Sequence, residues 1–163
     1  MRLLRTIRLD ESDLEVYGAA AEPGEWAVPG SFVFTFSQEG PEALSGKMRQ
    51  AFQHGFLGLG SFGWATLVMV EDITMTEYRQ AVERLAHHFV EHYGAPSMEA
   101  ALEEARKEVG FASSLCEHPP QTLLSVQRRI DGRGVVEQFS KHEPRVAWEA
   151  QQPIALVPGE PEP

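Results

Sequence analysis

Two histidines stand four positions apart in the chain, and a cysteine and another histidine follow further on: His88, His92, Cys116 and His118. Imidazoles spaced i, i+4 on a helix share one face and can hold the same metal ion. A thiolate and a third imidazole would complete the four ligands of tetrahedral zinc. The two halves match no known zinc spacing, so a zinc site is one hypothesis. The alternative is that the histidines lie at a helix edge.

Cys116 could also act as a nucleophile, because His118 lies two residues beyond it. A neighbouring imidazole lowers the pKa of a thiol and so raises its reactivity. However, the sequence identifies neither a residue that would orient the histidine nor an oxyanion hole. We therefore assign no catalytic residue and expect Cys116 to be a small buried side chain. Whether the protein is an enzyme stays open, with a non-enzyme favoured.

The segment 54–64 combines glycines with large apolar side chains. Gly58 to Gly63 matches the G-x-G-x-x-G string of dinucleotide-binding loops. Here a helix is expected before the string and a strand after it, which reverses the order that pyrophosphate binding requires. No cofactor is therefore expected. Because connecting loops are usually polar, we interpret Phe56, Leu57 and Leu59 as a candidate protein-interaction patch.

A third hypothesis is a small-molecule pocket between the predicted sheet and a predicted helical hairpin. Phe32, Phe34 and Phe36 alternate along a predicted strand and would line this pocket. Arg128 or Arg129 would reach an anionic ligand. A deep cavity with convergent polar groups would distinguish this hypothesis from the interaction patch.

Hydrophobic periodicity and helix-capping residues predict the strands and helices that carry these candidate residues. Alternation or continuous apolar runs predict strands over 2–9, 32–36, 64–70, 123–130 and 135–140, with a short edge strand at Val146 and Trp148. The Thr74-Met75-Thr76-Glu77 capping box begins a long helix that ends at Gly94. A second helix begins after Pro96, and a short helix begins at Ser45.

This order of elements predicts an α+β, two-layer fold. We expect a mainly antiparallel sheet of about five strands, with an αα-hairpin packed on one face. Residues 1–150 are predicted to form a single domain. Residues 151–163 form a proline-rich, acidic C-terminal tail that cannot fold alone.

The composition limits the class of protein. The chain has 163 residues, 42% of them hydrophobic, and a formal charge of −10. This acidic balance argues against binding nucleic acid, because phosphate contacts need clustered Lys and Arg. The single cysteine excludes an internal disulfide and is compatible with a reducing cytoplasm. We predict a soluble, cytoplasmic protein with no membrane segment.

Several segments together resemble one family. They are Arg5-Thr6-Ile7-Arg8-Leu9-Asp10, Ala21 to Val28, Gln50 to Leu59, Tyr93 to Pro96 and the region of Cys116 to His118. Over its whole length the chain resembles a family of short proteobacterial proteins described as a domain of unknown function. The resemblance implies one coherent bacterial fold, and it implies no activity.

The favoured functional hypothesis is an accessory subunit or assembly factor that acts through a protein partner or as a homo-oligomer and has no catalysis of its own. Its basis is the apolar glycine segment beside an incomplete set of catalytic groups. The alternative is a small-molecule-binding protein or enzyme with a pocket between sheet and helical hairpin, possibly zinc-dependent.

Overall fold

The computed structural model describes residues 1–35, 44 and 46–142. In these residues the strands are β1 (Arg2–Ile7), β2 (Trp26–Val28), β3 (Phe56–Gly58), β4 (Trp64–Ala65), β5 (Leu67–Asp72), β6 (Leu123–Asp131) and β7 (Gly134–His142). The helices are α1 (Ser12–Val16), α2 (Phe32–Thr35), α3 (Gly46–His54), α4 (Met75–His92) and α5 (Met98–Ser114). Among these described helices, none has the length and apolarity needed to cross a membrane.

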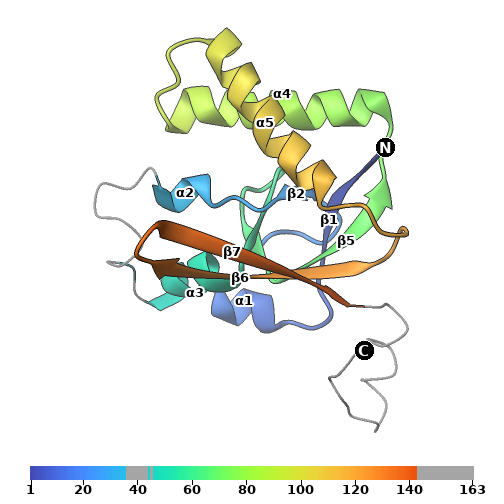
Figure 1. The fold of residues 1–163 in the computed structure, drawn as a ribbon, viewed down its shortest axis with the longest axis vertical. Helices are drawn as coiled ribbons and strands as arrows, with labels where there is room; N and C mark the ends of the chain where they lie inside the picture. Colours follow the sequence, from blue (N-terminus) through green and yellow to red (C-terminus); the bar gives the residue numbers. More distant parts are fainter. Residues whose placement is uncertain (36–43, 45, 143–163) are drawn as a thin grey trace, which may run out of the picture.

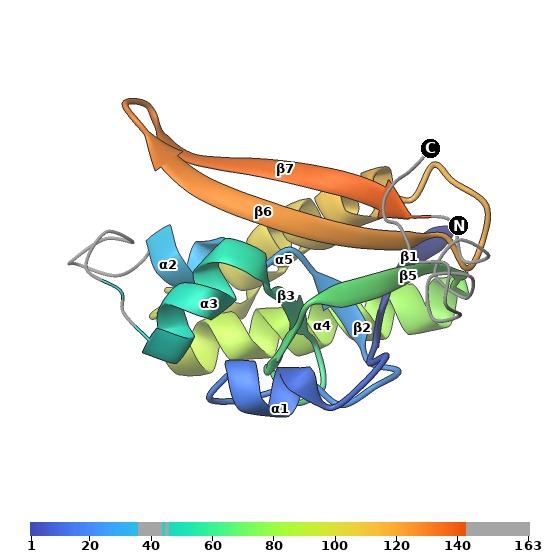
Figure 2. The ribbon, with the colours of Figure 1, turned by 90° about the horizontal axis from the view of Figure 1, so that it is seen from below.

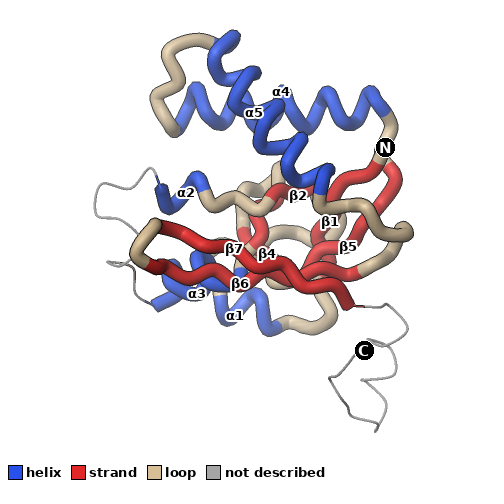
Figure 3. The backbone as a smooth tube through the Cα atoms, viewed as in Figure 1, coloured by secondary structure: helices blue, strands red, loops and turns tan. Residues whose placement is uncertain are grey.

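The strands form one antiparallel sheet in the order β4-β3-β2-β1-β5-β6-β7. They are drawn as arrows in Figure 1 and in red in Figure 3. The sheet curls into a half-barrel, and the long β6–β7 hairpin forms one margin of it (Figure 2). The α+β class and the antiparallel pairing are confirmed. The described residues contain seven strands rather than about five, because β2 and β3 have three residues each, too few for alternation to reveal.

Helices cover both sides of the sheet, so the predicted two-layer arrangement is wrong. The crossed helices α4 and α5 lie on one side, and α1 and α3 lie on the other (Figure 1). The exposure of residues in the central strand β1 agrees with cover on both sides, because Leu3 and Leu4 are both 0% exposed. Neighbouring residues of a strand point to opposite faces. Both faces of β1 must therefore be covered.

The predicted strand over 32–36 is also wrong, because its described part forms the single turn of helix α2. The amides of Val33 and Phe34 donate to the carbonyls of Gly30 and Ser31, at 3.2 and 3.0 Å. Gly30 has φ +83°, a conformation that favours glycine and turns the chain out of β2. The winding sends Phe32 toward Phe89 and Phe34 toward Trp64. Aromatic packing on two sides thus overrides the alternating pattern.

The predicted central strand over 64–70 is divided between two places in the sheet. Its first part, β4, lies at one margin, whereas β5 is paired between β1 and β6. The break falls at Thr66, whose hydroxyl donates to the buried carboxylate of Asp13 at 2.9 Å. The Thr66 hydroxyl also contacts the Tyr17 hydroxyl at 2.7 Å. Side chains from the region of α1 thus bond to Thr66 at the point where the chain leaves its pairing with β3 and begins its pairing with β1 and β6.

The predicted helical hairpin is confirmed, and so are the capping signals at the start of each of its helices. The prediction that Gly110 ends the second helix is wrong, because α5 continues to Ser114. The Thr74 hydroxyl accepts from the Glu77 amide at 3.1 Å, and the Glu77 carboxylate accepts from the Thr74 amide at 3.1 Å. At the start of α5 the Ser97 hydroxyl accepts from the Ala100 amide at 3.1 Å. Gly94 directly follows the C-cap of α4 and has φ +68°, the left-handed conformation in which many helices end. The buried face of α5 is built largely from alanines, which lets the helix approach the sheet closely: Ala101, Ala105, Val109 and Ala112.

Some predictions fall on parts of the chain that the structure does not describe. They concern Phe36, Ser45, the edge strand at Val146 and Trp148, and the tail over 151–163. The division into a domain over 1–150 and a tail over 151–163 therefore stays a prediction.

Candidate functional site

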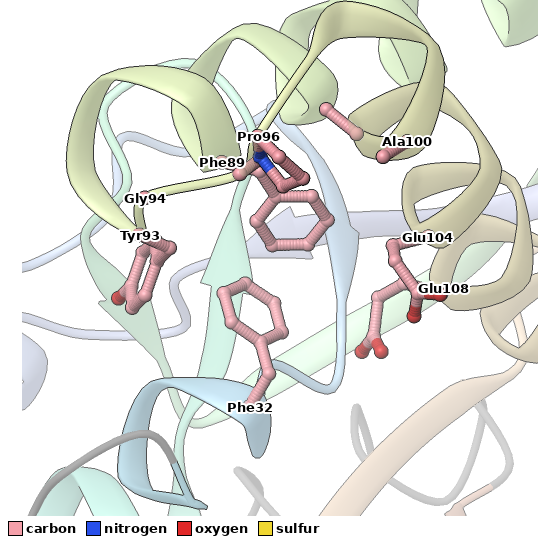
Figure 4. Close-up of a pocket in the computed structure, with 10 residues that line it drawn as sticks. Phe32, Phe89, Tyr93, Gly94, Pro96, Ala100, Glu104 and Glu108 are labelled. Carbon is pink, nitrogen blue, oxygen red and sulfur yellow. The ribbon is translucent and has the colours of Figure 1, made fainter.

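A pocket of about 240 Å³ opens between α2 and the linked ends of α4 and α5 (Figure 4). Its position only partly matches the predicted pocket between sheet and hairpin, because α2 forms its base in place of a strand. It is lined by Phe32, Phe89, Tyr93, Gly94, Ala95, Pro96, Ala100, Ala101, Glu104 and Glu108.

Three aromatic rings form the apolar wall of the pocket. The Phe32 and Phe89 rings meet edge to face with centroids 5.0 Å apart, and Phe32 meets Tyr93 in the same way at 5.5 Å. Phe89 belongs to the last turns of α4, and Tyr93 caps that helix. The rings therefore converge because a helix end is packed on the single turn of α2.

Two carboxylates form the opposite wall. Glu104 and Glu108 lie one helical turn apart on α5, so both point to the same side, facing the rings in Figure 4. Burial raises the pKa of Glu108 above its ordinary value. The amide of Gly30 donates to this carboxylate at 3.4 Å, a long hydrogen bond. Glu104 is exposed and accepts from Lys107 at 3.2 Å.

This combination of groups favours a cationic ligand. Aromatic rings attract cations through their quadrupole, and a carboxylate that has lost water gains most from an opposite charge. An anion would meet repulsion from both glutamates. The charged groups of this pocket are thus negative, whereas the predicted pocket relied on arginines to hold an anionic ligand.

The sequence analysis missed the acidic wall for a specific reason. Glu104 and Glu108 each precede a buried residue of α5, Ala105 and Val109, so they lie at the border of the apolar stripe. Helical periodicity alone indicates such a border position. It cannot show that the end of another helix faces it, and an acidic chain offers many similar glutamates.

The predicted interaction patch lies in the core of the protein. Phe56 and Leu57 belong to β3, and their exposed fractions are 0% and 2%. Leu59 follows the strand and is 4% exposed. In this folded chain a partner could reach these side chains only if β3 separated from its neighbours. Their role in partner binding stays a prediction.

The glycine loop after β3 encloses a carboxylate of the same chain. The amides of Gly60 and Ser61 both donate to one oxygen of Glu25 at 2.7 Å. The Ser61 hydroxyl and the Glu22 amide donate to the other oxygen at 2.6 Å. The loop is therefore a nest for an anion, which the sequence analysis did not predict, and the anion is a side chain of the same chain.

The close approach of this carboxylate explains the glycines of the loop. A Cβ atom at Gly58 would lie 2.4 Å from the Glu25 carboxylate oxygen. At Gly63 a Cβ atom would lie 2.6 Å from the backbone of Ala20. Side chains at these positions would force the loop away from Glu25 and from the chain before β2.

The tip of the loop is anchored on α4 by aromatic stacking. Phe62 adopts φ +57°, which is uncommon for a bulky residue, and its ring stacks on His88 with centroids 3.7 Å apart. Burial, and next the charge of His92, lower the pKa of His88. A neutral imidazole suits this stack. Arg84 adds a hydrogen bond to the Gly60 carbonyl at 2.7 Å.

Arg128, predicted to bind a ligand, is 2% exposed and makes all its described contacts within the protein. Its guanidinium donates to the Glu137 carboxylate at 2.8 Å. It also donates to the carbonyls of Phe52 and Gly55 at 2.8 and 2.9 Å, and to the carbonyl of Pro29. Its contacts are thus with the protein itself. The neighbouring Arg129 is exposed, and a ligand-binding role for either residue stays a prediction.

The four residues of the predicted zinc site lie at two ends of the helical hairpin. The His88 and His92 rings are neighbours near the end of α4, with centroids 4.7 Å apart. Cys116 follows the far end of the 17-residue helix α5, about 25 Å long at 1.5 Å per residue. The described residues contain no group of three or more His, Cys, Asp or Glu that could hold a metal ion.

Cys116 is surrounded by protein. The side chain is 3% exposed, and its thiol donates to the Ala112 carbonyl at 3.5 Å. Burial raises the pKa of this thiol to about 12. The thiolate needed for a nucleophile or a zinc ligand is therefore disfavoured at neutral pH.

Comparison with known families supports the resemblance to a domain of unknown function. Residues 1–155 match a family model described as a Family of unknown function (DUF6505), and the chain belongs to this family. Neither the curated proteins nor the solved structures that were searched contain a match. The family carries no described activity, so the function must be argued from the site itself.

Among single substitutions in β6, replacing Arg128 should lower the free energy of unfolding most. Arg128→Met leaves the Glu137 carboxylate and the carbonyls around it without their donor, so we expect a loss of about 3–5 kcal/mol in the free energy of unfolding. Urea denaturation would measure it. Arg129→Met is the matched control, and an equal effect of the two substitutions would contradict the assignment.

Glu25→Gln should destabilise the glycine loop. An amide group cannot accept from four donors, and its own NH₂ would meet N–H groups, so we expect a loss of about 2 kcal/mol. Hydrogen exchange of the Gly60 and Ser61 amides would accelerate. Glu22→Gln, three residues away and exposed, should leave both measurements unchanged.

Proposed function

We propose that the protein is a small-molecule-binding protein whose pocket takes an organic cation, with an ammonium or guanidinium group carried on an apolar frame. The observation that carries this proposal is the convergence of Phe32, Phe89 and Tyr93 on the carboxylates of Glu104 and Glu108. Of the two functions that the sequence suggested, this favours ligand binding at the helical hairpin over an interaction patch at the glycine loop.

The burial of Glu108 supports the sign of the ligand's charge. Loss of water raises the pKa of this carboxyl, and Arg128 opposes the rise only in part. Arg128 itself is directed to Glu137 and to backbone carbonyls. A ligand cation in the pocket would supply the charge that the carboxylate lacks, and this electrostatic gain is larger in a partly buried site than in water.

The aromatic wall supports the apolar part of the ligand. Phe32 and Phe89 are 9% and 6% exposed, so the wall is set into the protein and held by edge-to-face contacts. Such a wall is formed before the ligand arrives, which lowers the cost of ordering side chains on binding. A cation over an aromatic face contributes about 0.5–2 kcal/mol. The overall charge of −10 would also attract a cation over longer distances.

The binding experiment uses phenethylammonium as the probe, and 3-phenylpropionate as an anion of similar shape. Calorimetric titration at pH 8 should detect binding of the cation and none of the anion. Glu108→Gln should weaken the binding of the cation at least tenfold, about 1.4 kcal/mol, because it removes the buried charge and keeps the shape. Glu103→Gln is the matched control, because Glu103 is exposed on the same helix and does not line the pocket. Equal binding of both probes, or an unaffected Glu108→Gln variant, would sink the proposal.

The same substitution should change how stability depends on pH. Because the folded pKa of Glu108 is raised, the folded protein holds this proton more tightly than the unfolded chain does. Stability is therefore lost as the pH rises from about 4.5 through the folded pKa. Glu108→Gln should be more stable than the wild type at pH 7, and the difference should vanish below pH 4.5. Thermal denaturation over this pH range measures it, and a less stable variant at pH 7 contradicts it.

A further inference from the structure

His88 lies between the glycine loop and the cation pocket. Its ring stacks on Phe62, with centroids 3.7 Å apart and an interplanar angle of 3°. It also meets the ring of Tyr93, with centroids 5.5 Å apart. Tyr93 in turn lines the pocket and meets Phe32 edge to face (Figure 4). A continuous series of ring contacts therefore leads from the glycine loop to the wall of the pocket.

Helical spacing explains why His88 is placed there. Arg84, His88 and His92 are four residues apart along α4, so they follow one side of the helix. Phe89 and Tyr93, each one residue further along the chain than a histidine, face the pocket from the adjoining side. His88 itself does not line the pocket, so its ring lies behind the aromatic wall that the ligand would touch.

The groups around His88 decide when its ring is charged. In the described part of the chain, the titratable and charged side chains that line the hollow beside it are all on α4: Arg84, His87, Glu91 and His92. The loop contributes only the uncharged Ser61 and Phe62 to this hollow.

These surroundings favour the neutral form of the His88 ring. Burial lowers the pKa of His88 most, the charges of His92 and Arg84 lower it further, and Glu91 opposes them. On the pocket side Tyr93 stays uncharged, because burial raises the pKa of its hydroxyl. The imidazole is therefore neutral at pH 8 and gains its charge in mildly acidic solution.

A proton on His88 and a cation in the pocket would act against each other. The two positive charges would lie on either side of the Tyr93 ring, where water screens them less than in bulk solvent. Both charges would also be attracted to the same aromatic wall, so each reduces what the wall offers the other. Such coupling is reciprocal: protonation weakens ligand binding by the same factor by which the ligand disfavours protonation.

We infer that His88 is a proton-sensitive regulator of the cation pocket, whose neutral form permits binding of the cation and whose protonated form weakens it. The inference rests on the proposed function, because it needs a cation in the pocket. It adds to that function a residue that lies outside the pocket and acts through the Tyr93 ring.

Proton NMR of the histidine rings of the wild-type chain tests this coupling. With saturating phenethylammonium, the midpoint of the His88 titration should move to lower pH by about half a unit, which corresponds to a threefold coupling factor. His87 is the internal control, because it is exposed on the same helix and does not line the pocket. Its midpoint should stay in place.

Calorimetric titration of the His88→Gln variant gives the reciprocal measurement. The dissociation constant of the wild type for phenethylammonium should rise between pH 8 and pH 5.5, and the rise should be about threefold smaller in His88→Gln. Titration of Glu108 contributes to both proteins, so the difference between them isolates His88. The matched variant His87→Gln should behave as the wild type.

The outcomes distinguish this inference from the proposed function. If phenethylammonium does not bind at pH 8, both the cation pocket and the role of His88 are overturned. If it binds at pH 8, an unmoved His88 midpoint or an equal pH dependence of the wild type and His88→Gln overturns the role of His88 alone. The NMR measurement needs no variant, so it decides the question even if His88→Gln does not fold.

Discussion

The buried guanidinium of Arg128 holds together parts of the fold that the sheet itself does not join. β6 and β2 are separated in the strand order by β1 and β5, so no ladder hydrogen bonds connect them. Arg128 extends from β6 to the carbonyl that follows β2, to the Phe52 carbonyl in the last turn of α3 and to the Gly55 carbonyl just after that helix. Those carbonyls have no partner within a helix and carry its partial negative charge. Burial lowers the pKa of Arg128, and its hydrogen bond with Glu137 opposes that effect, which keeps the cation inside the curl of the sheet.

Several carboxylates of this acidic chain hold its own loops and helix ends in place by accepting hydrogen bonds. Glu25 orders the glycine loop, Asp13 holds the strand break at Thr66, and Glu77 caps α4. Each accepts at least one hydrogen bond of 3.1 Å or less. Glu108 differs, because its described hydrogen bond is long while its surroundings are poor in water. This contrast, rather than the number of acidic residues, is the reason to expect that a cation in the pocket would stabilise the Glu108 carboxylate.

Local signals predicted much of the architecture. The Thr74–Glu77 capping box, the start of α5 after Pro96 and the two strands of the final hairpin lie where the sequence placed them, because these signals join residues that are close in the chain. The same approach failed at residues 32–35, where alternation suggested a strand and packing on two sides produced a turn of helix. It identified Phe32 as a pocket residue, but it did not find Glu104 or Glu108, whose partners come from α2 and the end of α4.

By itself, the sequence determined the helical hairpin, the final β-hairpin and the antiparallel α+β class. These properties depend on backbone conformation and on contacts within a few residues. Tertiary structure alone decided what fills the glycine loop, how the sheet curls, and which side chains line the pocket. Glu25 and Gly60 are 35 positions apart, and Arg128 and Pro29 are 99 apart. A buried charge takes whichever donors or acceptors the folded chain brings to it, and no spacing along the sequence specifies that choice.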